Sequence, residues 1–101
     1  MKQVIKIDAD LEELFPVYLK SKRDELARIP LLLETGDLDA VRVIGHKMRG
    51  SGGGYGLDFL TDLGERMENS ASAGDKTALA AQAAELKDFL DSLVIEFVRI
   101  E

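Results

Sequence analysis

Two glycine-aspartate pairs, Gly36-Asp37 and Gly74-Asp75, constrain the fold of this chain more than any other feature of its sequence. Glycine readily adopts the left-handed backbone conformation that ends many helices, and an aspartate side chain accepts a hydrogen bond from the first turn of the helix that follows. Each pair therefore predicts that one helix ends and another begins almost at once. Helices joined by such short turns pack antiparallel to one another, which favours a helical bundle.

The part of the chain before the first of these turns is predicted to hold one short and one long helix. Residues 1–8 form an N-terminal extended arm in this interpretation, and an aspartate suited to an N-cap favours a short helix over 9–15. A proline that suits the first turn of a helix opens the long segment 16–34, whose apolar residues are spaced for one helical face. Pro30 lies inside that segment, and we expect it to kink or break the helix.

Three further amphipathic segments follow, and each begins shortly after a glycine. One starts at Leu38 and runs into a glycine cluster that ends at Gly56, and the next ends before Gly74. The last is predicted to be helical over 76–99, with an apolar stripe formed by Leu79, Leu86, Leu90, Leu93 and Phe97. We therefore predict an all-α fold, an antiparallel four-helix bundle with a short extra N-terminal helix, built as a single domain over 1–101.

Composition excludes several kinds of site. The chain contains no cysteine, so disulfides, zinc fingers and thiol nucleophiles are excluded. Its formal net charge of −6 argues against binding along a nucleic-acid backbone. The opening residues, MKQVIKID, lack the apolar core of a signal peptide, and no apolar run approaches the roughly 20 residues that span a membrane. We therefore expect a cytoplasmic protein that contacts neither membranes nor nucleic acids. We also expect a stand-alone protein that is a monomer.

The only histidine, His46, lies in the second long segment, and a helical wheel at about 100° per residue separates it from the predicted core. The core arc contains Leu38, Val41, Ile44, Gly45, Met48, Gly52 and Tyr55. The histidine lies opposite, flanked by Arg42, Arg49, Gly50 and Gly53. Because no acidic residue occurs from 40 to 57, the arginines and Lys47 form a basic island that suits one compact anion or an acidic pocket on a partner protein.

Other chemistries that glycine and histidine support fit the spacing poorly. A phosphate loop needs lysine directly after its second glycine, but Ser51 follows Gly50, and the glycine spacing of dinucleotide-binding loops is also absent. A hydrolytic dyad of His46 with Ser51 or Ser70 would need a tertiary coincidence, and one histidine with scattered carboxylates is weak support for a metal site. An ordinary surface histidine and a frayed helix end stay open as alternatives. A solvent-facing imidazole among cations is also well placed to hold a phosphoryl group.

The residues around this histidine resemble the motif of the histidine-containing phosphotransfer (HPt) domain. The stretch His46-Lys47-Met48-Arg49-Gly50-Ser51 is similar to the family pattern of His, any residue, Leu, Lys, Gly, then Ser or Ala, and Gly56 matches a glycine ten residues after the histidine. Arg49 departs from the usual lysine but retains its charge, and Met48 replaces leucine at similar volume. The resemblance covers most of the chain, since LFPVYLKSKRDEL and the glycine-aspartate turns also match.

This resemblance implies a role for each matching residue. His46 would be the phosphoacceptor through Nε2, Arg49 would neutralise the phosphoryl group, and Gly50 would admit the partner. Glu68, in the third long segment, matches a family position that is often Gln and would hydrogen-bond the other ring nitrogen. The docking face for a partner would also include Arg42, Val43, Lys47 and Gly53.

The resemblance also implies a relay function. A phosphoryl group would pass between His46 and the aspartates of response-regulator receiver domains or hybrid sensor histidine kinases, in a multistep two-component phosphorelay. No ATP-binding pattern is present, so we expect a phosphotransfer intermediate without autokinase activity rather than an enzyme. We expect no metal or cofactor on this chain, because Mg²⁺ would belong to the receiver. Two other functions stay open: an adaptor of the same fold that binds a partner without carrying phosphate, and a small enzyme or nucleotide-binding protein that uses the glycine cluster.

Overall fold

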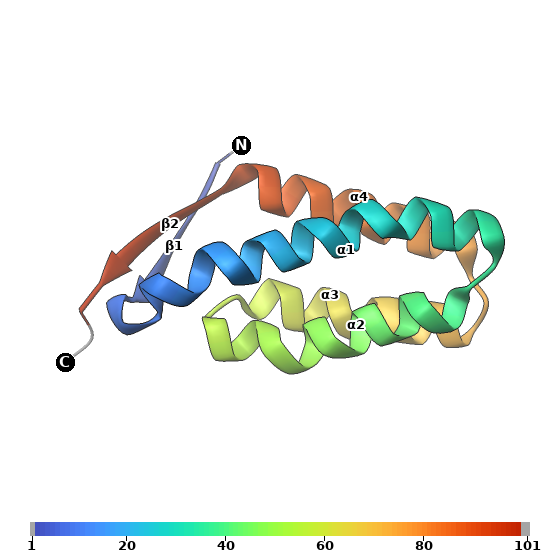
Figure 1. Cartoon of the computed structure of the whole chain (residues 1–101), viewed down its shortest axis with the longest axis horizontal. Coiled ribbons are helices and arrows are strands. Elements are labelled where there is room, and N and C mark those ends of the chain that lie inside the picture. Colours follow the sequence, from blue (N-terminus) through green and yellow to red (C-terminus); the bar gives the residue numbers. More distant parts are fainter. Residues whose placement is uncertain (1, 100–101) are drawn as a thin grey trace.

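Residues 2–99, the part of the chain that this computed structural model describes, contain four α-helices in two layers along the long axis (Figure 1). Helices α1 (Phe15–Thr35) and α4 (Lys76–Ser92) form one layer, and α2 (Leu38–Gly52) and α3 (Asp58–Ser72) form the other. Two 3₁₀ helices, η1 (Ala9–Leu14) and η2 (Gly53–Tyr55), precede α1 and follow α2. Strands β1 (Gln3–Asp8) and β2 (Leu93–Val98) lie side by side at one end of the bundle (Figure 1).

Both glycine-aspartate turns are confirmed. Gly36 and Gly74 adopt positive φ angles of 77° and 71°, the conformation that ends a helix at little cost only when the residue has no Cβ. The side chains of Asp37 and Asp75 each accept a hydrogen bond from the backbone N–H three residues later. The turns therefore reverse the chain from α1 to α2 and from α3 to α4, as the sequence predicts.

The fold is not all-α, because the C-terminal segment that was expected to be helical to residue 99 is a strand. Helix α4 ends at Ser92, and Leu93 is already extended, with φ −73° and ψ 125°. Strand β2 then pairs in parallel with β1 over six residues. Leu93 and Phe97 are four residues apart, a spacing that puts them on one side of a helix and equally on one face of a strand. The valines and isoleucine between α4 and the chain end favour the strand, and β1 supplies its hydrogen-bonding partner.

The N-terminal region and α1 also differ from the prediction. The short α-helix expected over 9–15 is instead the 3₁₀ helix η1, and Asp8 caps it by accepting a hydrogen bond from the N–H of Asp10. Pro30 does not break α1, which is helical on both sides of it. Because Pro30 is exposed, the hydrogen bond that its missing N–H removes lies at the surface, where water can satisfy the unpaired carbonyl.

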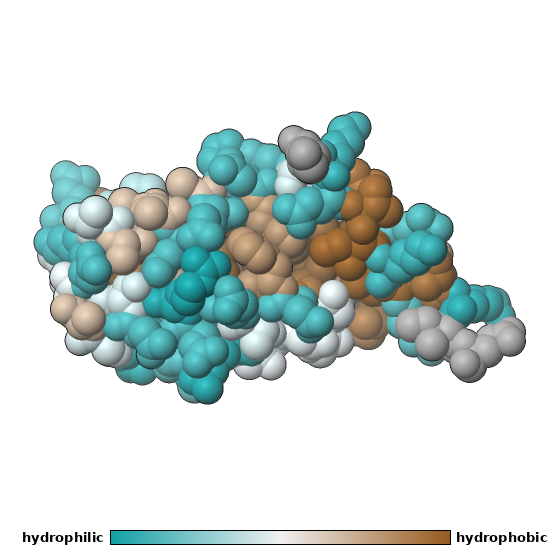
Figure 2. Space-filling model, turned by 180° about the vertical axis from the view of Figure 1, so that it is seen from behind, coloured by the Kyte–Doolittle hydropathy of each residue, from teal (hydrophilic) through white to brown (hydrophobic). Residues whose placement is uncertain are grey.

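The core lies between the two helical layers and continues to the sheet. Its fully buried side chains include Phe15, Ile29, Val41, Met48, Leu60, Leu63, Met67, Leu79 and Leu86. Apolar side chains also remain at the surface near the strands, and Figure 2 shows an apolar area at that end of the molecule, bordered by hydrophilic residues. None of the helices in the described residues has the length and apolar character needed to cross a membrane.

Candidate functional site

The imidazole of His46 projects from α2 into solvent. Its side chain is 66% exposed, whereas Val41, Ile44, Gly45, Met48 and Gly52 on the opposite face of α2 are buried. The helical wheel is therefore confirmed for these core residues. Leu38 and Tyr55 are only partly buried, and Tyr55 lies in η2 rather than α2.

Glu68 of α3 fixes one nitrogen of the imidazole. Nδ1 of His46 lies 2.9 Å from Oε2 of Glu68. A carboxylate only accepts hydrogen bonds, so Nδ1 is the donor, and a neutral ring then carries its free lone pair on Nε2. The contact therefore orients the ring and leaves Nε2 as its nucleophilic nitrogen.

Arg49 holds the other oxygen of the same carboxylate. Its Nη1 donates a hydrogen bond of 3.1 Å to Oε1 of Glu68, whose side chain is 18% exposed. The hydrogen bond from Arg49, and after it the one from His46, lowers the pKa of Glu68 below the usual range of a glutamate. Glu68 is therefore ionised at neutral pH and carries its negative charge between the imidazole and the guanidinium.

Two glycines bring α3 close enough for Glu68 to reach the imidazole. A Cβ built on Gly64 of α3 would lie 2.4 Å from the backbone nitrogen of Arg49 and 2.6 Å from the carbonyl oxygen of Gly45. A Cβ on Gly45 would lie 2.9 Å from the backbone nitrogen of Glu68. The backbones of the two helices thus touch at the level of His46. A residue with a side chain at either glycine position would keep them apart.

A comparison with protein families identifies the family of this chain. A family model described as "Hpt domain" matches residues 13–95. The chain belongs to the HPt domain family. Proteins of this family are phosphocarriers in two-component phosphorelays, where they interact with receiver domains and kinases. Searches of the curated proteins and of the solved structures found no match.

The predicted docking residues of this HPt domain lie around the histidine with different degrees of exposure. Lys47, Gly50 and Gly53 are exposed, and Val43 is partly buried. Arg42 is also partly buried, and its guanidinium binds Asp39 at 3.0 Å. Because Glu68 and Asp39 pair with cations of the basic island, the island is less positive in the structure than its sequence suggests.

Gly64 and Tyr18 were not among the residues predicted for the site. A glycine in the middle of an otherwise helical segment is the signal that could have identified Gly64 as a helix contact. Tyr18 of α1 forms a hydrogen bond of 2.9 Å with the hydroxyl of Ser51, and its ring stacks on Tyr55 with centroids 3.9 Å apart. Burial raises the pKa of Tyr18, so its hydroxyl stays protonated. Nothing in the local sequence pairs Tyr18 with Ser51.

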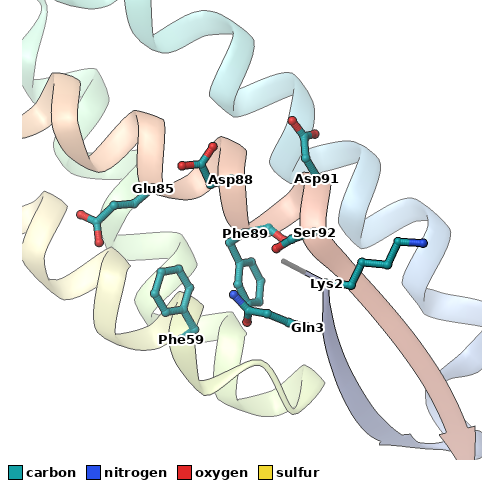
Figure 3. Close-up of a pocket in the computed structure, with 8 residues that line it drawn as sticks. All are labelled: Lys2, Gln3, Phe59, Glu85, Asp88, Phe89, Asp91 and Ser92. Carbon is teal, nitrogen blue, oxygen red and sulfur yellow. The ribbon is translucent and has the colours of Figure 1, made fainter.

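A hollow near the strands is separate from this site. It has a volume of about 590 Å³ and lies between α3, α4 and the start of β1 (Figure 3). Figure 3 shows the rings of Phe59 and Phe89 beside each other in it, with Glu85 and Asp88 at its edge. It contains none of the residues predicted for the phosphoryl site. Among residues 2–99, no group of three metal-ligating side chains occurs either.

Proposed function

We propose that this HPt domain carries a phosphoryl group on Nε2 of His46 and exchanges it with the aspartate of a receiver domain. The observation that carries the proposal is the hydrogen bond between Nδ1 and Glu68 on a ring that is 66% exposed. This arrangement fixes the proton on one nitrogen and presents the lone pair of the other to a partner.

The proposed transfer conserves atoms and charge. The Nε2 lone pair attacks the phosphorus of the receiver's aspartyl phosphate, the bond from phosphorus to the aspartate oxygen breaks, and the aspartate leaves as a carboxylate. The imidazole becomes a phosphorylated imidazolium whose proton stays on Nδ1. The negative charge of Glu68, 2.9 Å from that nitrogen, stabilises the imidazolium. The reverse sequence returns the phosphoryl group to an aspartate.

In this proposal Arg49 neutralises part of the charge of the phosphoryl group. Within residues 2–99, the Arg49 guanidinium donates one side-chain hydrogen bond, to Glu68, which leaves other N–H donors of the fork for phosphoryl oxygens. Arg42, Val43, Lys47, Gly50 and Gly53 form the proposed docking face. Any Mg²⁺ that the transfer needs would be held by the receiver. We further propose that the protein acts as a cytoplasmic monomer with receiver domains or hybrid sensor kinases as partners.

The test is transfer from a phosphorylated receiver. Purified receiver domains are charged with a small phosphodonor, the free donor is removed, and acid-labile, base-stable phosphate on this chain is followed. Wild type should gain phosphate and His46→Gln should gain none. If His46→Gln gains as much as wild type, the carrier proposal is wrong. If wild type binds a receiver but gains no phosphate, the protein is an adaptor of the same fold.

The role of Arg49 has its own variants in the same assay. Arg49→Ala should transfer about tenfold more slowly than wild type, as expected for losing one charged hydrogen bond. Arg49→Lys keeps the charge, and its transfer rate should lie between those of Arg49→Ala and wild type. A transfer rate for Arg49→Ala equal to that of wild type would remove the proposed role.

A further inference from the structure

The end of α2 next to the histidine is intrinsically weak. Five of the seven residues from 50 to 56 are glycine, and a glycine inside a helix lowers its stability by about 1 kcal/mol relative to alanine. Even if Gly50 and Gly54 carried a Cβ, it would meet nothing within 4 Å. Yet the chain stays helical to Gly52 and continues into η2. Contacts from outside this segment must hold it in place.

Tyr18 of α1 holds both ends of the weak segment. Its hydroxyl forms the 2.9 Å hydrogen bond with Ser51, and its ring stacks on Tyr55 at an interplanar angle of 17°. Ser51 is the second residue of the segment and Tyr55 is the second from its end. One side chain thus spans the glycine-rich stretch.

Tyr18 is itself fixed from several directions. The residue is only 7% exposed, and the ring of Phe15 packs edge-on against it with centroids 6.5 Å apart. The ammonium of Lys22, which pairs with Glu25, lies 5.2 Å from the centroid of the Tyr18 ring. Phe15 also contacts Tyr55, with centroids 5.6 Å apart. The tyrosine is therefore a rigid support rather than a mobile side chain.

We propose that Tyr18 is a positioning residue for the partner: through Ser51 and Tyr55 it holds residues 50–56 in the shape that a receiver domain meets beside His46. This inference rests on the proposed function. Gly50 lies one helical turn after His46, and Gly53 and Gly54 are exposed, so the segment forms part of the surface next to the imidazole. Glu68 rather than Tyr18 contacts the imidazole. Tyr18 therefore acts on docking and not on the transfer step.

The test separates docking from transfer by varying receiver concentration. Tyr18→Phe keeps the aromatic stack and removes only the hydroxyl, and Ser51→Ala removes its partner. Each should raise the receiver concentration that gives half-maximal transfer by about three- to tenfold, while the maximal rate changes by less than about twofold. Because both variants delete the same hydrogen bond, the double variant should show no larger effect than either single one.

Ser70→Ala is the matched control. Ser70 accepts a side-chain hydrogen bond of 2.9 Å from Gln82, which joins α3 to α4 much as Tyr18 and Ser51 join α1 to α2. Its loss should lower thermal stability without changing the half-saturating receiver concentration. If Tyr18→Phe and Ser51→Ala shift that concentration no more than Ser70→Ala does, the positioning role is wrong.

Amide hydrogen exchange gives a second measurement that needs no phosphate. The N–H groups of Gly56 and Leu57 donate to the carbonyls of Gly53 and Gly52, so they report on the shape of the segment. They should exchange several-fold faster in Tyr18→Phe than in wild type or Ser70→Ala. Unchanged exchange in Tyr18→Phe would overturn the inference whatever the transfer kinetics show. Failure of the carrier proposal itself is distinct, because wild type would then gain no phosphate.

Discussion

Helices α2 and α3 and the short η2 between them contain two kinds of glycine, which differ in what surrounds the missing side chain. A Cβ on Gly45 or Gly64 would collide with the backbone of the facing helix, whereas a Cβ on Gly50 or Gly54 would meet nothing within 4 Å. The buried pair permits the helix contact on which the fold depends. The exposed pair lowers helix stability and permits no such contact inside the molecule. In the proposed function, the bare backbone beside His46 leaves room for the receiver domain.

The buried pair also connects the fold to the site. Gly45 precedes His46 directly, and Gly64 lies one helical turn before Glu68. The closeness of the helices at these glycines brings the Glu68 carboxylate to Nδ1. The geometry of the imidazole thus depends on two residues that have no side chain.

Gly64→Ala should have the largest effect of any change to these glycines. The new methyl group would lie 2.4 Å from a backbone nitrogen, which cannot move away as a side chain can. The helices would have to separate, and we expect a loss of about 3 kcal/mol or more in the free energy of unfolding. Chemical denaturation measures it, and the exposed neighbour Asn69→Ala should change stability by no more than about 0.5 kcal/mol. Wild-type stability in Gly64→Ala would show that the helix contact tolerates a side chain.

Gly50→Ala should have the opposite effect on stability. Gly50 has a helical backbone and open space around its missing Cβ, so alanine should stabilise the fold by about 0.5–1 kcal/mol. The same methyl group would project beside His46 and should slow phosphoryl transfer from a receiver several-fold. A more stable protein with slower transfer is the expected combination.

Gly54→Ala provides the graded comparison for this prediction. Gly54 is as open as Gly50 but lies eight residues after His46 rather than four. Its substitution should slow transfer less than Gly50→Ala does. Equal slowing by both variants would mean that proximity to the imidazole does not explain the slower transfer. Faster or unchanged transfer in Gly50→Ala would contradict the proposed difference between the two kinds of glycine.

The helices and the exposed face of α2 could be predicted because their signals are local. A glycine followed by an aspartate determines where a helix ends and the next begins, and the apolar spacing of α2 places His46 opposite the core. Glu68 was different: its place beside His46 followed from the family resemblance and not from any spacing in the sequence. Its hydrogen bonds to His46 and Arg49 depend on how α2 and α3 meet.

The remaining differences have tertiary causes. The apolar spacing of residues 93–98 fits both a helical stripe and a strand; their β-branched residues favour the strand, and β1 supplies the partner that it pairs with. Gly64 and Tyr18 also depend on contacts with distant parts of the chain. Gly64 packs against Gly45, and Tyr18 contacts Ser51 and Tyr55. Local patterns predict which face of a helix is buried, but they do not predict which residue it meets.

Glu68→Gln should have the smallest effect on stability. This effect can be recognised because it depends on pH. The pKa of Glu68 is lowered in the folded protein, first by Arg49 and then by His46. A lowered folded pKa means that the carboxylate stabilises the fold above its ordinary pKa of 4.5, and that this stabilisation is lost as the pH falls through the lower folded value. Wild type should therefore be more stable than Glu68→Gln at neutral pH, and the difference should shrink below pH 4.5.

Denaturation midpoints of both proteins across the acidic range measure this difference. Glu65→Gln, an exposed position on the same helix, controls for the removal of one negative charge, and its profile should stay parallel to that of wild type. If Glu68→Gln also stays parallel to wild type down to acidic pH, the carboxylate does not hold Arg49 and His46 in solution as it does in the structure. The buried glycines would then serve helix packing alone, and their connection to the imidazole would be lost.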